Sequence, residues 1–146
     1  MRAYLSRRYR ISASHRLHAN VFTEDRNREV YGKCNNPHGH GHNYVIEVTV
    51  GGPVNAETGM VCNLGDLDAW VRKVVVDRFD HTNLNLDPLF QDRVPTTENL
   101  SIEVYRLLAA AFDKAEVVRV RVEETSNNSF EYPIHTPFAA GYRPMS

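Results

Sequence analysis

The sequence is poor in the features that mark secreted and membrane proteins. Its two cysteines, Cys34 and Cys62, are too few for a disulfide scaffold and favour a reducing, cytoplasmic setting. No apolar run approaches the roughly 20 residues that span a bilayer. Residues 1–11 scatter four arginines among their apolar residues and lack the unbroken apolar stretch of a signal peptide. We therefore expect neither a membrane span nor a cleaved leader.

An excess of charge of one sign is also absent, because the formal net charge is -1. Such a chain has no long-range attraction to nucleic acid or to an anionic membrane, so we expect a small molecule as its partner. The composition, 42% hydrophobic and 24% charged over 146 residues, is that of one ordinary globular domain. We expect a single domain over residues 1–146, in which the tail 133–146 is loose or forms an interface arm.

Alternation of apolar and polar residues predicts four strands. In the first strand, residues 2–15, the side chains of Tyr9, Ile11, Ala13 and His15 share one side. The other three strands are expected at residues 42–50, 117–124 and 130–134. A polar, irregular stretch separates the first two strands, from about residue 19 to residue 41.

Two amphipathic helices are predicted between the second and third strands. Apolar residues recur at helical spacing over residues 66–79 and again over 100–112, where Thr96 or Thr97 can cap the second helix. The order strand, strand, helix, helix, strand, strand predicts an α+β fold. We expect a four-stranded antiparallel sheet with both helices on one face, and open sheet edges that favour oligomerisation.

Three histidines form the clearest chemical pattern. The run His40-Gly41-His42 places two imidazoles two residues apart at the start of the second strand, so both point to the same side. His15, at the end of the first strand, can supply a third. Three neutral imidazoles leave one tetrahedral position of zinc open, which is typical of a catalytic zinc site. We expect no primary ligand among His18, His38 and His135.

Four further residues each leave two interpretations open. Glu124 continues the row of alternating valines in residues 118–122, so it is either solvated at the strand end or buried to receive N–H donors from a bound heterocycle. Asp80 and His81 are either a chance dipeptide or a pair in which the carboxylate orients the imidazole for proton transfer. Cys34 is either inert or a thiolate favoured by nearby histidines and a metal.

Several segments carry a resemblance to a known family. Residues 32–44, GKCNNPHGHGHNY, resemble the signature of the 6-pyruvoyl-tetrahydropterin synthase family, in which a cysteine is followed after five residues by His-Gly-His. Other blocks agree in order and spacing: SHRL at 14–17, TGMV at 58–61, DHTNL at 80–84, TTENL at 96–100 and ETSNN at 124–128. The resemblance spans roughly residues 8 to 130.

This resemblance implies a tunnelling fold, in which sheets of neighbouring subunits join in a trimeric barrel and two trimers stack into a hexamer with active sites between subunits. It also implies a zinc ion, bound by His15, His40 and His42. Cys34 would abstract a proton, and the pair Asp80 and His81 would relay protons.

The implied reaction converts 7,8-dihydroneopterin triphosphate to 6-pyruvoyl-tetrahydropterin with elimination of triphosphate. Glu124 would anchor the pterin ring in a pocket lined by Thr96, Thr97 and Glu98. The candidates for contacts with the triphosphate are Arg16 and Lys33.

Alternatives come from the same family and from other classes. His38 also creates a Cys-x3-His-Gly-His pattern, which resembles the 6-carboxytetrahydropterin synthases of deazapurine biosynthesis, but the flanking residues follow the pyruvoyl enzymes more closely. A non-catalytic pterin-binding protein would be expected to lose Cys34 or the histidines, and all are present. A zinc peptidase or amidase is disfavoured because no His-Glu-x-x-His motif occurs.

Overall fold

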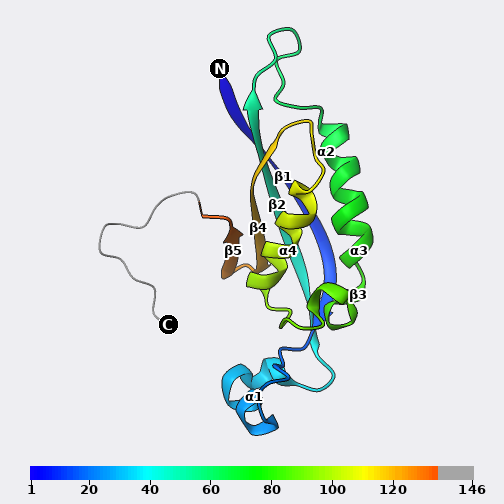
Figure 1. The fold of residues 1–146 in the computed structure, drawn as a ribbon, viewed down its shortest axis with the longest axis vertical. Helices are drawn as coiled ribbons and strands as arrows, with labels where there is room; N and C mark the ends of the chain where they lie inside the picture. Colours follow the sequence, from blue (N-terminus) through cyan, green and yellow to red (C-terminus); the bar gives the residue numbers. More distant parts are fainter. Residues whose placement is uncertain (135–146) are drawn as a thin grey trace, which may run out of the picture.

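The computed structural model describes residues 1–134, which form one mixed sheet with a layer of helices (Figure 1). The sheet contains five strands: β1 (Arg2–His15), β2 (His40–Pro53), β3 (Thr82–Asn83), β4 (Glu116–Thr125) and β5 (Asn128–Tyr132). The α-helices are α1 (Glu24–Tyr31), α2 (Leu64–Val71), α3 (Asp77–Phe79) and α4 (Thr97–Ala109). A π-helical stretch, η2 (Arg72–Val76), joins α2 to α3, and short 3-10 turns are η1 (Gly32–Asn35), η3 (Leu84–Leu86) and η4 (Pro88–Phe90).

The strand order across the sheet is β3-β1-β2-β4-β5. β1 and β2 pair antiparallel along their whole length, from Arg2 opposite Pro53 to His15 opposite His40. β2 also pairs antiparallel with β4, so β2 lies between two long neighbours. β3 pairs parallel to β1 at only two positions, Ala13 and Ser14. The long β1–β2 pairing therefore brings the last residue of one strand beside the first residue of the other.

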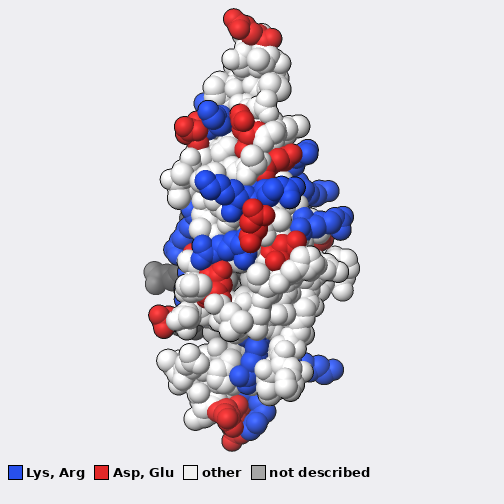
Figure 2. All heavy atoms as spheres, turned by 90° about the vertical axis from the view of Figure 1, so that its right-hand side faces the viewer, with Lys and Arg blue, Asp and Glu red and all other residues white. Residues whose placement is uncertain are grey.

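The helices α2, α3 and α4 cover one face of the sheet (Figure 1), and the core lies between the two layers. The largest fully buried apolar and aromatic side chains there are Tyr44, Phe79, Ile46, Leu67, Leu84, Leu100 and Leu108. The opposite sheet face is polar, with a small hollow lined by Arg8, Arg10, Val45, Glu47, Arg121 and Glu123. Charges of both signs are also mixed in a band across the middle of the side seen in Figure 2.

These observations confirm the α+β class and the helices on one face, and they correct the sheet. The predicted four-stranded antiparallel sheet is wrong in detail, because a fifth strand, β3, pairs parallel to β1. β3 has only two residues, which is too short for an alternation of apolar and polar side chains to be recognised in the sequence. Helix α1 was missed within the supposedly irregular stretch because only Asn27 on it is buried, which leaves no apolar stripe. The element order is thus more complex than two strands, two helices and two strands.

The valine row of β4 also differs from its prediction. The register between β2 and β4 shifts at Thr49 and Val50, which is typical of a β-bulge. As a result Val117 is buried and Val118 only partly so, whereas Val120 and Val122 lie on the core face as expected. An extra residue in a strand reverses which side chains point inward, and strict alternation in the sequence does not reveal it.

Two other predictions concern the N-cap of α4 and the C-terminal tail. Thr96 caps α4, since its hydroxyl accepts a hydrogen bond from the amide of Asn99. The predicted loose tail lies outside the described residues from position 135 onward. Among residues 1–134, no helix is long and apolar enough to cross a membrane.

Candidate metal and substrate site

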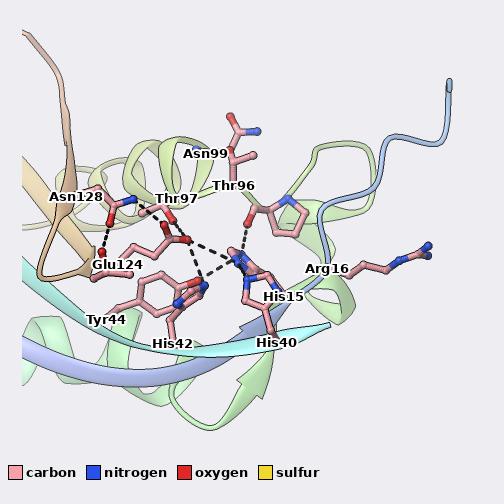
Figure 3. Close-up of polar contacts among 12 residues, drawn as sticks. His15, Arg16, His40, His42, Tyr44, Thr96, Thr97, Asn99, Glu124 and Asn128 are labelled. Carbon is pink, nitrogen blue, oxygen red and sulfur yellow. Dashed lines mark hydrogen bonds and ion pairs between the residues drawn. The ribbon is translucent and has the colours of Figure 1, made fainter. Parts of the chain in front are cut away.

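Three histidine side chains meet where β1 ends and β2 begins (Figure 3). One ring nitrogen from each of His15, His40 and His42 lies within 4.8 Å of the others. The Nε2 atoms of His15 and His40 are 3.1 Å apart. Two donors bound to one tetrahedral zinc at ~2.0–2.1 Å lie about 3.3 Å from each other, so this spacing suits a shared ion.

The surroundings of His15 fix which ring nitrogen is available. Its Nδ1 lies 2.8 Å from the carbonyl oxygen of Pro95, to which it donates a proton. Nε2 is then the unprotonated nitrogen, and it faces the other histidines. Such a second hydrogen bond orients most histidines that bind metals.

Burial favours the neutral form of two histidines in the cluster. It is the main cause that lowers the pKa of His15 and also that of His42 below the ordinary value for histidine. The Nε2 atom of His42 is buried and has no hydrogen-bond partner in the described residues. Neutral imidazoles with free, converging lone pairs are what a metal ion requires, so the three residues fit a zinc ion.

Glu124 reaches this cluster from the end of β4. Its Oε1 atom lies 3.4 Å from Nε2 of His42 and 3.8 Å from Nε2 of His15. The same carboxylate accepts hydrogen bonds from the Thr97 hydroxyl at 2.9 Å and from the Asn128 amide at 3.0 Å. Its side chain is only 18% exposed, so the carboxylate is largely enclosed and held in one orientation.

Cys34 lies in turn η1, in a segment that is bound to the residues after His15. The amide of Leu17 donates to the carbonyl oxygen of Cys34 at 2.9 Å, and the side chain of Asn35 donates to the carbonyl oxygen of Leu17 at 2.7 Å. The Cys34 side chain is partly exposed and is not one of the clustered groups. The thiol is therefore accessible while its backbone is fixed.

Asp80 and His81 are paired with each other, and His81 lines the same hollow as His42 without a hydrogen bond to it in the described residues. The Asp80 carboxylate accepts a hydrogen bond from the amide of Ser12 at 2.8 Å and lies 3.5 Å from Nε2 of His81. The His81 side chain is 81% exposed, at an open hollow of about 470 Å³ that is also lined by Ser12 and Asn43. Within residues 1–134, no hydrogen bond or ion pair joins His81 to Cys34 or to the three histidines.

The other predicted substrate contacts are spread around the site. Thr97 contacts Glu124, Thr96 caps α4, and Glu98 is exposed in the first turn of α4. Arg16 points away from the histidines (Figure 3), and its Nε donates to the carbonyl oxygen of Asn35 at 3.0 Å. Lys33 is exposed in η1.

The remaining histidines of the described chain lie outside the cluster. The Nδ1 atom of His18 is 3.0 Å from the side-chain amide of Asn35, and His38 is exposed in the turn before β2. Among residues 1–134, the only group of at least three potential metal ligands is His15 with His40 and His42. His135 lies outside the described residues.

Sequence reasoning missed two contributors to the site. Tyr44 is fully buried, and its hydroxyl lies 3.3 Å from Nδ1 of His15. Tyr44 points to the same side of β2 as His40 and His42, so the alternation of side chains along this strand could have predicted its position. The carbonyl oxygen of Pro95 had no such signal, because a backbone acceptor from a distant loop leaves no mark in the sequence.

Comparisons with known proteins place the chain in a family. The family model for 6-pyruvoyl tetrahydropterin synthase matches residues 4–134. The 6-pyruvoyl tetrahydrobiopterin synthase of Poecilia reticulata is 45% identical over 88% of each chain, and that of Homo sapiens is 43% identical over 89% of this chain and 90% of the relative. The solved 6-pyruvoyl tetrahydropterin synthase of Caenorhabditis elegans superposes with a TM-score of 0.87 at 37% identity, covering 90% of this chain and 95% of that one. This chain therefore belongs to the 6-pyruvoyl tetrahydropterin synthase family.

Proposed function

We propose that the protein is a zinc-dependent lyase that converts 7,8-dihydroneopterin triphosphate to 6-pyruvoyl-tetrahydropterin and releases triphosphate. The single observation that carries this proposal is the cluster of His15, His40 and His42 with a carboxylate, Glu124, against it. Membership of the family and the high identity to named 6-pyruvoyl tetrahydrobiopterin synthases support the same activity.

In the proposed mechanism, separate residues bind the metal, transfer protons and contact the triphosphate. Zinc, when bound by the three histidines, supplies a Lewis acid that makes protons on the substrate side chain more acidic. The Cys34 thiolate removes one such proton, and His81, oriented by Asp80, returns one to the product. Triphosphate is a good leaving group, so cations near it are sufficient, and Arg16 and Lys33 remain the candidates.

Glu124 is proposed to anchor the pterin ring. A carboxylate accepts two parallel N–H bonds, which matches the paired donors of a pterin. The hydrogen bonds from Thr97 and Asn128 support this role, because they hold the carboxylate in place before a ligand arrives. Thr96 and Glu98 begin the same helix and are proposed to line the pocket.

We also propose that a second copy of the chain completes each active site, within a hexamer. The exposure of His81 supports this, since its imidazole contacts no other catalytic candidate except Asp80 in the described part of its own chain. The sheet has open edges that favour pairing between subunits, because β1 is covered by β3 at only two positions.

Subunit complementation tests that shared site. Cys34→Ala and His81→Ala variants, each inactive alone, should regain part of the activity when mixed and reassembled, because some sites then combine two intact residues. Sedimentation should give a hexamer. A monomer, or mixtures that stay inactive, would contradict a site built from two chains.

Product analysis tests the reaction itself. Mass spectrometry of the product from dihydroneopterin triphosphate, with an assay for released triphosphate, should detect 6-pyruvoyl-tetrahydropterin. Formation of acetaldehyde and 6-carboxytetrahydropterin would instead identify the related carboxy enzyme. Binding of the substrate without release of triphosphate would identify a pterin-binding protein.

Metal analysis tests the cofactor. We expect one zinc per chain in the purified protein, and a His42→Ala variant should lose it and unfold at a lower temperature, because bound metal stabilises the folded state. The control is His38→Ala, which changes an exposed histidine outside the cluster and should keep full zinc content. Full zinc content in the His42 variant would disprove the assignment.

A further inference from the structure

An arginine beside the histidine cluster is held in place but has no counter-charge. The side chain of Asn85 binds both the backbone amide and the backbone carbonyl of Arg16, at 2.7 and 2.9 Å. The Nε atom of Arg16 donates to the carbonyl oxygen of Asn35 at 3.0 Å. Within residues 1–134 no carboxylate pairs with this guanidinium, whereas most other arginines form ion pairs. Its two terminal nitrogens are therefore available to an anion.

The side-chain amide of Asn35 orients a second donor, His18. The amide nitrogen of Asn35 donates to the carbonyl oxygen of Leu17 at 2.7 Å and lies 3.0 Å from Nδ1 of His18. An amide nitrogen only donates, so Nδ1 of His18 accepts and the ring proton is on Nε2. Asn35 is only 5% exposed, so it is a fixed support for both Arg16 and His18.

Arg16 and His18 line the same hollow, which has a volume of about 700 Å³. It lies between the segment that follows β1 and the loop that precedes α4. Pro95 also lines it, and the carbonyl oxygen of Pro95 accepts the hydrogen bond from His15. The hollow therefore adjoins the histidine cluster.

The charges around this hollow favour an anion. Arg93 lines it and pairs with the carboxylate of Glu103, which also pairs with Arg106. Two arginines thus share one carboxylate and leave a net positive charge, to which Arg16 adds another. Asp92 opposes them from the wall of the hollow, but its side chain is exposed, so water and salt screen its charge.

We propose that Arg16 and His18 form a polyphosphate subsite that binds the triphosphate of the substrate. This inference rests on the proposed function, in which Glu124 holds the pterin ring and the histidines hold the metal. Figure 3 shows Glu124 and Arg16 on opposite sides of the histidine cluster. That order matches the substrate, in which the reacting side chain lies between the ring and the triphosphate. The planar guanidinium offers two N–H donors to one phosphate, and the imidazole of His18 adds a third.

A pair of ligands tests this subsite. Neopterin and neopterin triphosphate differ only in the phosphates, so the ratio of their affinities measures what the phosphates contribute. The titrations follow pterin fluorescence with the full-length, zinc-loaded protein, and zinc content is measured afterwards because polyphosphates chelate metals. We expect the wild-type protein to bind the triphosphate form at least about 10-fold more tightly, the usual effect of hydrogen bonds to a charged group.

Variants of the two donors should reduce that ratio. Arg16→Ala should weaken the binding of neopterin triphosphate about 10- to 100-fold and leave the affinity for neopterin unchanged. Arg16→Lys keeps the charge but loses the planar fork, so it should recover only part of the affinity. His18→Phe removes a neutral donor and should cost about 3- to 10-fold, again only for the triphosphate form.

Two further variants separate a local contact from a general effect of charge. Arg10 is exposed on the opposite face of the sheet and, in the described residues, also lacks an ion pair. Arg10→Ala removes the same charge as Arg16→Ala and should leave both affinities unchanged. Asp92→Asn removes the opposing charge and should strengthen the binding of neopterin triphosphate by up to about 5-fold. Weaker binding in Asp92→Asn would contradict the subsite.

The proposal is overturned if Arg16→Ala leaves the ratio of the two affinities unchanged, because Arg16 then contributes nothing specific to the phosphates. Should Arg16→Ala fold poorly, as seen in thermal melting, Arg16→Lys and His18→Phe decide by the same ratio. If the wild-type protein binds neither pterin, the proposed function fails, and calorimetry with inorganic tripolyphosphate then tests the subsite alone. Weaker tripolyphosphate binding in Arg16→Ala than in the wild type would support the subsite, and equal or absent binding in both would overturn it.

Discussion

The carboxylate of Glu124 faces the imidazole of His42 across β4 and β2, with Oε1 3.4 Å from Nε2. The two residues are 82 positions apart in the chain, from 42 to 124, and meet because β2 pairs with β4. The proposed pterin anchor thus lies directly against the proposed metal site. A ligand held by Glu124 would have its side chain next to the metal.

Glu124→Gln should weaken neopterin binding by roughly 10- to 100-fold while the protein stays folded. The amide keeps the shape of the side chain but loses the charge that accepts paired N–H bonds, an interaction worth about 1.5–3 kcal/mol. Fluorescence titration measures the affinity, and thermal melting monitors the fold. Glu123→Gln is the matched control, because Glu123 lines the hollow on the opposite sheet face. Equal affinities for wild type and Glu124→Gln would refute the anchor.

Cys34→Ala should keep zinc and the thermal midpoint but lose about 10²- to 10⁴-fold in triphosphate release, the usual contribution of a positioned general base. The fixed backbone and partly exposed thiol of Cys34 fit that role. Cys62→Ala is the control, since burial raises the pKa of the Cys62 thiol and keeps it protonated. Loss of zinc together with the midpoint would indicate that Cys34 is a metal ligand instead.

Gly39→Ala should disturb the histidine cluster more than the fold as a whole. Gly39 has a φ of 70°, and a Cβ there would lie 2.9 Å from the carbonyl oxygen of His15. Relief of that clash must move either His15 or the adjacent His40, so zinc affinity should fall at least 10-fold. Gly59→Ala, with a φ of 72° and open space around the new Cβ, carries only the backbone strain of about 1–2 kcal/mol.

Zinc titration and thermal melting of both glycine variants distinguish the two effects. The Gly59 variant should melt earlier and bind zinc normally. If both variants bind zinc as the wild type does, the contact between Gly39 and His15 does not position the cluster.

Asp68 gives the protein a pH-dependent contribution to stability. Hydrogen bonds from Arg7 and then from Tyr9 lower the pKa of this carboxyl group. Because the folded-state pKa lies below the unfolded value of about 3.9, the contribution is fully present above that pH and is lost as the pH falls through the folded-state pKa.

Urea unfolding of wild type and Asp68→Asn at several pH values measures this contribution. The variant should be slightly less stable at pH 7, and the difference should begin to shrink below about pH 3.9 and disappear once the pH is below the folded-state pKa of Asp68. Asp92→Asn, which changes an exposed carboxylate, is the control. A difference that persists at low pH would indicate that packing, and not the charge, is responsible.

The sequence alone determined the features that depend on local periodicity and spacing. Alternation in β1 and β2 placed His15, His40 and His42 on one face of the sheet, and helical spacing identified the layer that covers this face. The 13-residue signature at 32–44 pointed to the family that the comparisons then established. These inferences succeeded because a strand turns every second side chain to the same face, whatever the rest of the chain does.

Tertiary structure alone decided which distant groups complete the site. The carbonyl of Pro95 fixes the proton on His15, the Thr97 hydroxyl donates to Glu124, and a bulge in β4 sets which valines are buried. Tertiary structure also left the His81 side chain exposed, in a hollow that His42 lines as well. Contacts of this kind depend on strand register and on backbone atoms, which every residue carries alike, so no pattern of side chains in the sequence encodes them locally.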